Sequence, residues 1–255
     1  MSTKDPRRGT FDGPRPPKIG RPLTTLTIPS RFNGPPASGN GGYSCGMLAA
    51  HLEGPAAVSL RLPVPLDREL ELRAEEDGAV RAFAGEDLIA EAVAAEPLAP
   101  WSGPAVSLAE ARAAVDHFAA PPAGVFDHCF VCGRAREDGF DVFAGPVGDG
   151  GVVASPWIPP AWAADEDGAV RPEFVWSTLD CPAYYALHGT DLTIAYLARQ
   201  QSEIIAPPRA GVTYVAVGVP LERSGRKGLA ATAILDEDGT VLAHSGLLVI
   251  VPRGV

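Results

Sequence analysis

Positive charge and long apolar runs are both scarce in this chain of 255 residues. The 21 lysine and arginine residues are outnumbered by 31 aspartate and glutamate residues, which gives a formal net charge of -10. Phosphate binding needs a basic surface, so this balance argues against nucleic acid as the main partner. No apolar stretch reaches the roughly 18 residues that span a bilayer, and we expect no membrane partner. Residues 1–20 are charged and proline-rich without the apolar core of a signal peptide, which predicts a flexible tail and a cytoplasmic protein.

Cysteine is scarce as well. Four cysteines in a chain of this length do not suggest a disulfide scaffold, and we expect reduced thiols. Cys129 and Cys132 beside His128 form half of a zinc site, but structural zinc takes four ligands and the sequence has no second close pair. We therefore prefer buried thiols that stabilise a loop over zinc.

Two common nucleotide motifs are also missing. The sequence has no glycine-rich phosphate loop ending in Lys-Ser or Lys-Thr, and no dinucleotide-binding fingerprint after a strand. We expect no bound cofactor.

The first half of the chain predicts a strand, a buried helix and a run of further strands. The first strand spans 22–29, and the nearly all-apolar helix spans 42–52. Glu76-Asp77-Gly78 is a hairpin signal within the run. The four strands of the run are expected at 57–63, 68–75, 79–84 and 87–95.

A proline-rich stretch separates the first half from the rest. It holds one helix, 107–119, and the pair Ser107 and Glu110 forms a capping box at the start of that helix. These features indicate a linker over 98–126.

The second half repeats the order of the first. Its helix is expected at 172–187, and Pro182 inside that pattern predicts a kink or a break. Strands are expected before the helix at 140–143 and 152–157, and after it at 191–199, 212–220, 228–235 and 240–251.

The two helix starts look like the same element, 131 residues apart. The first reads Asn40-Gly41-Gly42-Tyr43 and the second Arg171-Pro172-Glu173-Phe174. Two copies of a strand, a helix and a run of antiparallel strands predict an α+β chain. An apolar helix flanked by such strands packs best against a curved sheet wrapped around it.

This order resembles the hotdog fold of the acyl-CoA thioesterase and dehydratase superfamily, in tandem as a double hotdog. The resemblance covers about residues 22–252. The first half is similar to double-hotdog proteins that start their helix with Asn-Gly-Gly-Tyr. The second half is similar to small bacterial hotdog thioesterases through Cys129-Phe130-Val131-Cys132-Gly133, Gly139-Phe140-Asp141-Val142, Val152–Trp157, Val170-Arg171-Pro172-Glu173 and Leu179-Asp180.

The resemblance implies two hotdog units, 21–97 and 127–255. Each is a curved antiparallel sheet wrapped around a central helix, and the two pack as a pseudo-dimer. It also implies an acyl-CoA thioesterase-like protein that binds or hydrolyses an acyl thioester, with coenzyme A present only as part of the substrate. A homodimer of double hotdogs is a further possibility.

Thioester hydrolysis needs donors for an oxyanion and a carboxylate that activates water or attacks directly. The first helix start offers backbone donors at Gly41, Gly42 and Tyr43, and a side-chain donor at Asn40, but Ala49 stands where an acid would be.

The second helix has the acid, Asp180, but its start includes Pro172, which has no N–H, and Glu173, which would repel an oxyanion. We therefore predict one composite site in which Asn40, Gly41 and Gly42 face Asp180. The reciprocal pairing of the second helix start with Ala49 would be inactive.

A structural interpretation stands beside this one. Asp180 could simply bind the backbone near Pro182, and Gly41-Gly42 could be a tight turn. The protein would then be a non-catalytic acyl or acyl-CoA binding module.

Other residues are candidates for the substrate, each with a structural alternative. Glu173 could position water or pair with Arg171. Ser177 and Thr178 could orient water. The basic residues of a predicted hairpin loop could contact the nucleotide end of coenzyme A or be a solvated turn. These basic residues are Arg223, Arg226 and Lys227.

The segment Gly42-Tyr43-Ser44-Cys45-Gly46 matches the Gly-x-Ser-x-Gly nucleophile elbow. That elbow needs a buried parallel strand just upstream, whereas this sequence has a loop rich in glycine, proline and serine. We expect Ser44 to be a small helix residue, and a serine esterase using Ser44 is a remote alternative.

Overall fold

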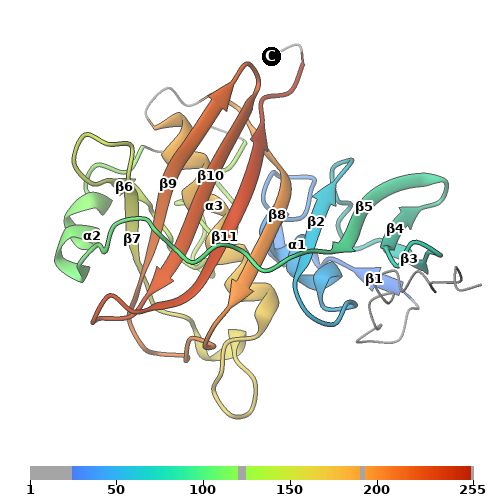
Figure 1. Cartoon of the computed structure of the whole chain (residues 1–255), viewed down its shortest axis with the longest axis horizontal. Helices are drawn as coiled ribbons and strands as arrows, with labels where there is room; N and C mark the ends of the chain where they lie inside the picture. Colours follow the sequence, from blue (N-terminus) through green and yellow to red (C-terminus); the bar gives the residue numbers. More distant parts are fainter. Residues whose placement is uncertain (1–24, 120–124, 190–192, 254–255) are drawn as a thin grey trace, which may run out of the picture.

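The computed structural model describes residues 25–119, 125–189 and 193–253 (Figure 1). The tail predicted at 1–20 lies outside these residues. Within them, eleven strands form one sheet in the order β1-β3-β4-β5-β2-β8-β11-β10-β9-β7-β6, and every pair of neighbouring strands is antiparallel. None of the helices in this part of the chain is long and apolar enough to cross a membrane.

The strands of the first half follow the predicted order. Alternation in β3 buries Leu70 and Leu72 and exposes Glu71 and Arg73, as expected for a strand with one face against the core. The strands are β1 (Thr25–Thr27), β2 (Ala56–Leu60), β3 (Glu69–Ala74), β4 (Val80–Ala84) and β5 (Asp87–Ala94).

The strands of the second half form the larger part of the sheet. They are β6 (Gly145–Pro146), β7 (Val153–Trp157), β8 (Tyr196–Ile204), β9 (Tyr214–Ser224), β10 (Lys227–Leu235) and β11 (Val241–Ile250). The halves meet where β2 pairs with β8, with Ala57 opposite Gln201.

The strand predicted at 140–143 is wrong. These residues form no strand, because the N–H groups of Phe140 and Val142 donate to the carbonyls of Phe130 and Val131. The segment is therefore bonded to the loop that carries Cys129 and Cys132 rather than to the sheet.

The segment between β5 and α2 (Leu108–Val115) crosses the outer face of the sheet, in front of β8 and β11 in Figure 1. Gln201 of β8 donates a side-chain hydrogen bond to the carbonyl of Glu96 at 2.6 Å. The helix α2 follows, and the predicted capping box of Ser107 and Glu110 is confirmed.

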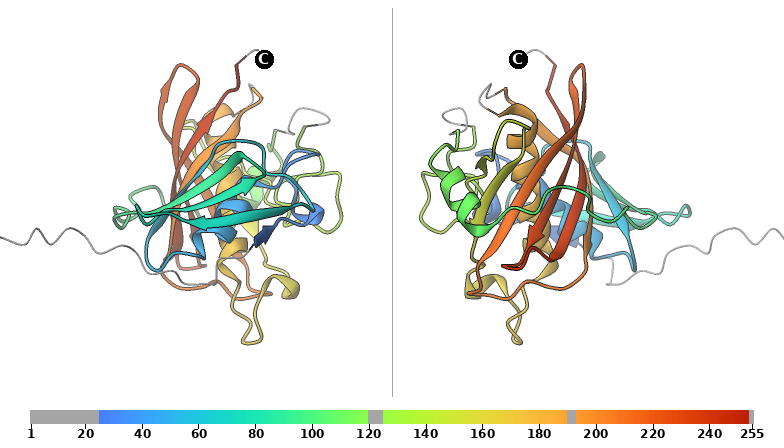
Figure 2. Two further views of the ribbon diagram at one scale, coloured as in Figure 1. Left: turned by 90° about the vertical axis from the view of Figure 1, so that its right-hand side faces the viewer. Right: turned by 60° about the vertical axis from the view of Figure 1, so that its left-hand side comes forward.

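Two central helices, α1 (Gly41–Ala49) and α3 (Pro172–His188), lie against the sheet and pack on each other. Figure 1 shows α3 behind β8 to β11, and Figure 2 shows the same layers from the sides. Gly42 and Gly46 let the two backbones approach. A Cβ on Gly42 would lie 2.6 Å from the Trp176 carbonyl oxygen, and one on Gly46 would lie 2.7 Å from the Glu173 Cα.

The predicted break at Pro182 does not occur, because α3 runs as one helix from Pro172 to His188. Every residue from Glu173 to His188 is buried, so packing on both sides holds the helix where one backbone hydrogen bond is missing. Gly218 on β9 lies against this turn, since a Cβ there would be 2.5 Å from the Pro182 carbonyl oxygen.

Candidate active site

A cavity of about 540 Å³ lies between the start of α1, the middle of α3 and the loop before β6. Much of its wall is apolar, with contributions from Leu60, Leu197 and Ile250. The polar groups on the wall include Asn40, Asp180 and three cysteines. A mostly apolar cavity with a few converging polar groups is the usual form of a small-molecule site.

Asp180 connects the two central helices at this cavity. It lies on α3 with 9% of its surface exposed, and its Oδ2 accepts a hydrogen bond of 2.9 Å from the backbone N–H of Gly42 on α1. Burial raises the pKa of Asp180 to about 7; the Gly42 hydrogen bond opposes this rise and nearby Cys129 adds to it. Near neutral pH this carboxyl group can therefore both hold and release a proton.

The start of α1 is organised by Asn40, which is buried and caps the helix. Its Oδ1 accepts a hydrogen bond of 2.9 Å from the Tyr43 N–H, and its Nδ2 donates toward the Cys129 sulfur at 3.8 Å. The Gly42 and Tyr43 amides are thus both occupied. Gly41 lines the cavity, and its N–H donates to no acceptor within the residues that the structure describes.

This arrangement leaves fewer free backbone N–H donors at the start of α1 than the sequence predicts. Gly42 holds the carboxylate and also allows the close approach of α1 and α3, so only the Gly41 amide stays available to a ligand. Gly41 is itself tightly enclosed, because a Cβ there would lie 2.8 Å from the Leu197 side chain and 3.1 Å from Asp180 Oδ2.

Several other candidate residues lie in the core instead of at the cavity wall. Tyr43 stacks on Phe32 with ring centroids 4.4 Å apart. The hydroxyls of Ser177 and Thr178 both donate to the carbonyl of Phe174, one turn earlier in α3.

Glu173 is also buried away from the cavity lining. It pairs with Arg171 across 3.5 Å, which was the structural alternative considered for it.

The basic residues of the predicted loop lie in the hairpin between β9 and β10, where Arg223, Arg226 and Lys227 are all exposed. None of them lines the cavity directly. Arg226 donates to the carbonyl of Val251 at 2.7 Å, and the neighbours of Val251 in sequence do line it. This hairpin is therefore close to the cavity rim.

Ser44 lies within α1 and not at a turn from a strand into a helix. Its hydroxyl donates to the Asn40 carbonyl at 2.7 Å, and only 3% of the residue is exposed. The short helix Ser30–Phe32 and a bend precede α1, so the parallel strand of a nucleophile elbow is missing from this described segment.

Among the cavity residues that were not assigned to a site from the sequence, four carry a charge or a thiol. Arg61 at the end of β2 lines the cavity and pairs with Glu91 at 3.1 Å. Arg61 belongs to no sequence motif, so the sequence does not indicate that it lines a cavity. The others are Cys129, Cys132 and Cys181, whose sulfurs all lie within 4.8 Å of one another.

The reciprocal pairing occupies a second, smaller hollow of about 190 Å³. Ala49, Pro172, Trp176 and Ser202 are among the residues that line it, and no aspartate or glutamate does. A carboxylate therefore lines the larger cavity, at Asp180, and none lines the smaller hollow.

Comparison with known proteins finds solved structures of similar fold but no relative by sequence. No family model matches the sequence, and no curated protein matches it. A thioesterase candidate of Novosphingobium aromaticivorans is 12% identical, with a TM-score of 0.58 over 89% of this chain and 94% of that chain.

Two further solved structures are similar over smaller parts. The tesB protein of Mycobacterium avium subsp. paratuberculosis is 12% identical over 78% of each chain, with a TM-score of 0.49. Zebra fish thioesterase superfamily member 2 is 12% identical over 46% of this chain and 90% of its own, with a TM-score of 0.41. The match to the Novosphingobium structure over 89% of this chain and the large antiparallel sheet beside the central helices show that this chain has a hotdog fold.

Proposed function

We propose that this protein binds an acyl thioester in the cavity and hydrolyses it to a carboxylic acid and a free thiol. One observation carries the proposal. The Asp180 carboxylate lies at the wall of a largely apolar cavity, held by the N-terminal turn of a helix from the other half of the chain. A buried carboxylate beside a helix N-terminus is a suitable base for chemistry that develops negative charge on oxygen.

In this proposal Asp180 is the general base. Gly42 holds Oδ2, and the second carboxylate oxygen takes a proton from water as that water attacks the thioester carbonyl. The pKa of about 7 places this group near the operating range of such a base. The Gly41 amide and the positive end of the α1 dipole face the developing oxyanion. A direct attack by the carboxylate on the carbonyl would use the same geometry.

The apolar wall suits the acyl group. Tyr184 and Tyr196 both line the cavity, and Phe126 between them packs against each ring, with centroids 5.6 and 6.0 Å away. Coenzyme A is the thiol carrier that we propose. Its phosphates would contact Arg61 at the cavity wall and Arg226 near the rim. The proposed hydrolysis needs no cofactor.

We also propose that the chain is a tandem double hotdog, with units at 21–97 and 127–255 joined by the linker 98–126. The equivalent start positions of the two central helices support this, because α1 begins after Asn40 and α3 after Arg171. A cytoplasmic location and a homodimer of such chains stay predictions.

A non-catalytic acyl-binding module is the second candidate. The occupied Gly42 amide favours it, because one of the expected oxyanion donors already binds Asp180. The two candidates are separated by measuring ligand binding and turnover on the same protein with a panel of acyl-CoA thioesters. Hydrolysis predicts release of free thiol; the binding module predicts a raised melting temperature with acyl-CoA and no thiol release.

A further inference from the structure

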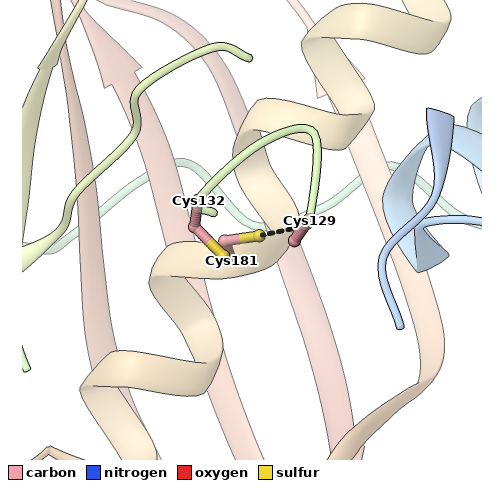
Figure 3. A group of neighbouring side chains, drawn as sticks. All are labelled: Cys129, Cys132 and Cys181. Atoms are coloured by element: carbon pink, nitrogen blue, oxygen red, sulfur yellow. Dashed lines mark hydrogen bonds between the residues drawn. The ribbon is translucent and has the colours of Figure 1, made fainter. Parts of the chain in front are cut away.

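Three of the four cysteines converge on one side of the cavity. Cys129 and Cys132 come from the loop before β6, and Cys181 comes from α3 (Figure 3). The sulfurs of Cys129 and Cys181 are 3.9 Å apart, and all three sulfurs lie within 4.8 Å of one another. All three residues are buried, and all three are free thiols.

These separations suit a thiophilic metal ion. Zinc binds thiolates at about 2.3 Å in a tetrahedron, which places neighbouring sulfurs about 3.8 Å apart. The distance of 3.9 Å between Cys129 and Cys181 is close to that value, and Cys132 would need at most a small approach. A disulfide, by contrast, requires two sulfurs at about 2.0 Å.

The loop is built to hold its two sulfurs in place. Gly133 donates from its N–H to the Cys129 carbonyl at 2.8 Å, and a Cβ at Gly133 would lie 2.4 Å from the Asp127 carbonyl oxygen. Phe130 and Val131, between the cysteines, are fully buried. The turn is therefore tight and anchored in the core, as a preformed metal site requires.

Polar groups around Cys129 favour its thiolate. The backbone N–H groups of Cys132 and Val131 hydrogen-bond to its sulfur. The Asn40 Nδ2 lies 3.8 Å from the same sulfur. Donors of this kind orient and tune metal ligands from outside the coordination sphere.

From this geometry we propose that Cys129, Cys132 and Cys181 bind one Zn²⁺ ion, with the fourth coordination position open to the cavity. The loop and α3 supply three thiolates, and all three cysteines line the cavity wall. A zinc ion with three protein ligands and an open position takes water or a ligand atom there. The isolated pair in the sequence lacked a partner because Cys181 lies 52 residues from Cys129 in the chain. The inference does not depend on hydrolysis.

Zinc binding to the full chain tests the proposal. The protein is reduced with a phosphine, stripped with a chelator and titrated with Zn²⁺ against a chromophoric competitor. We expect one ion per chain with sub-micromolar affinity. Serine substitution of Cys129, Cys132 or Cys181 is expected to weaken binding at least about tenfold. The matched control is Cys45→Ser, because Cys45 is equally buried on α1 but does not belong to the cluster. Equal binding by all variants, or an equal loss in Cys45→Ser, would overturn the proposal.

A second measurement uses the unsubstituted protein, so it tests the site even if the serine variants fail to fold. Zn²⁺ should slow alkylation of Cys129, Cys132 and Cys181 by a maleimide, as mapped by mass spectrometry of peptides, and leave the rate at Cys45 unchanged. Co²⁺ in place of Zn²⁺ should give the charge-transfer absorption of thiolate ligands. Unchanged alkylation of the three cysteines with Zn²⁺ present would contradict the site. Thioester hydrolysis does not enter either readout, so failure here is distinct from failure of the proposed activity.

Discussion

The Asp180 carboxylate on α3 accepts a hydrogen bond of 2.9 Å from the Gly42 backbone N–H on α1, although the two residues are 138 positions apart in the chain. This contact joins the first half of the protein to the second at the cavity wall. It also assigns each residue a double role, because Gly42 both holds the carboxylate and allows the helices to approach, while Asp180 both fastens α1 and presents a carboxylate to the cavity.

The first prediction concerns the packing of the two helices. Gly42→Ala places a Cβ 2.6 Å from the Trp176 carbonyl oxygen and 2.8 Å from the Ser177 Cα, and neither backbone atom can move alone. We expect the free energy of unfolding to fall by about 1–3 kcal/mol, measured by urea denaturation. Gly150→Ala is the control, since a Cβ there meets nothing within 4 Å. Equal stability of the two variants would mean that the close approach of α1 and α3 is not needed.

The second prediction concerns the pH dependence of hydrolysis. A general base must be deprotonated, and the pKa of Asp180 is about 7. In metal-free protein kept in a chelator, kcat/KM should rise with pH, reach a plateau above about pH 8 and fall about tenfold per pH unit well below pH 7. Stopped assays of thiol release across this range give the profile. An apparent pKa near the ordinary value of 3.8 for aspartate would show that a buried Asp180 does not control the rate.

The third prediction concerns acid stability in the first half. Arg81 on β4 contacts Glu91 at 2.6 Å and Asp77 at 2.8 Å. The hydrogen bond from Arg81 lowers the pKa of Glu91 below its ordinary 4.5, so the folded protein binds fewer protons than the unfolded chain. Stability from this pair is therefore present above about pH 5 and is lost as the pH falls through and below 4.5.

Arg81→Met tests this expectation. At neutral pH we expect a loss of at most about 1 kcal/mol, because the pair is partly solvated. The difference from the unsubstituted protein should shrink toward pH 3 in urea melts, to roughly the difference caused by packing alone. The exposed Arg68, for which the described residues give no ion pair, provides the control Arg68→Met. A loss for Arg81→Met that is constant from pH 7 to about pH 3 would contradict the electrostatic explanation.

Much of the secondary structure could be predicted from hydrophobic periodicity and turn residues. The second central helix, expected at 172–187, spans Pro172–His188, while the first, expected at 42–52, starts one residue earlier and ends at Ala49. The strand predicted at 140–143 does not form, because its backbone N–H groups donate to the loop that carries Cys129 and Cys132. No local sequence pattern reveals this contact. Of the kink or break predicted at Pro182, the break does not occur, since burial of the whole helix outweighs the local preference of proline.

The sequence predicted the types of residue at the site but not the distances between them. A carboxylate on one helix and glycines on the other suggested a facing pair, and the structure brings Asp180 and Gly42 into contact. The sequence could not tell that this contact would occupy the Gly42 amide, because that depends on the distance between two packed helices. The cysteine cluster was missed for a similar reason. Spacing within the chain revealed Cys129 and Cys132 but not that Cys181 faces them.

The measurement that tests the central claim most directly compares thioester hydrolysis by Asp180→Asn and Glu173→Gln. Both acids are buried on α3, but only Asp180 lines the cavity. Asparagine keeps the acceptor for the Gly42 N–H and removes the base. We predict that Asp180→Asn lowers kcat at least about 100-fold with little change in melting temperature, while Glu173→Gln stays within about threefold of the unsubstituted protein. Full activity in Asp180→Asn on every thioester that the unsubstituted protein accepts would contradict the role of Asp180 as the base.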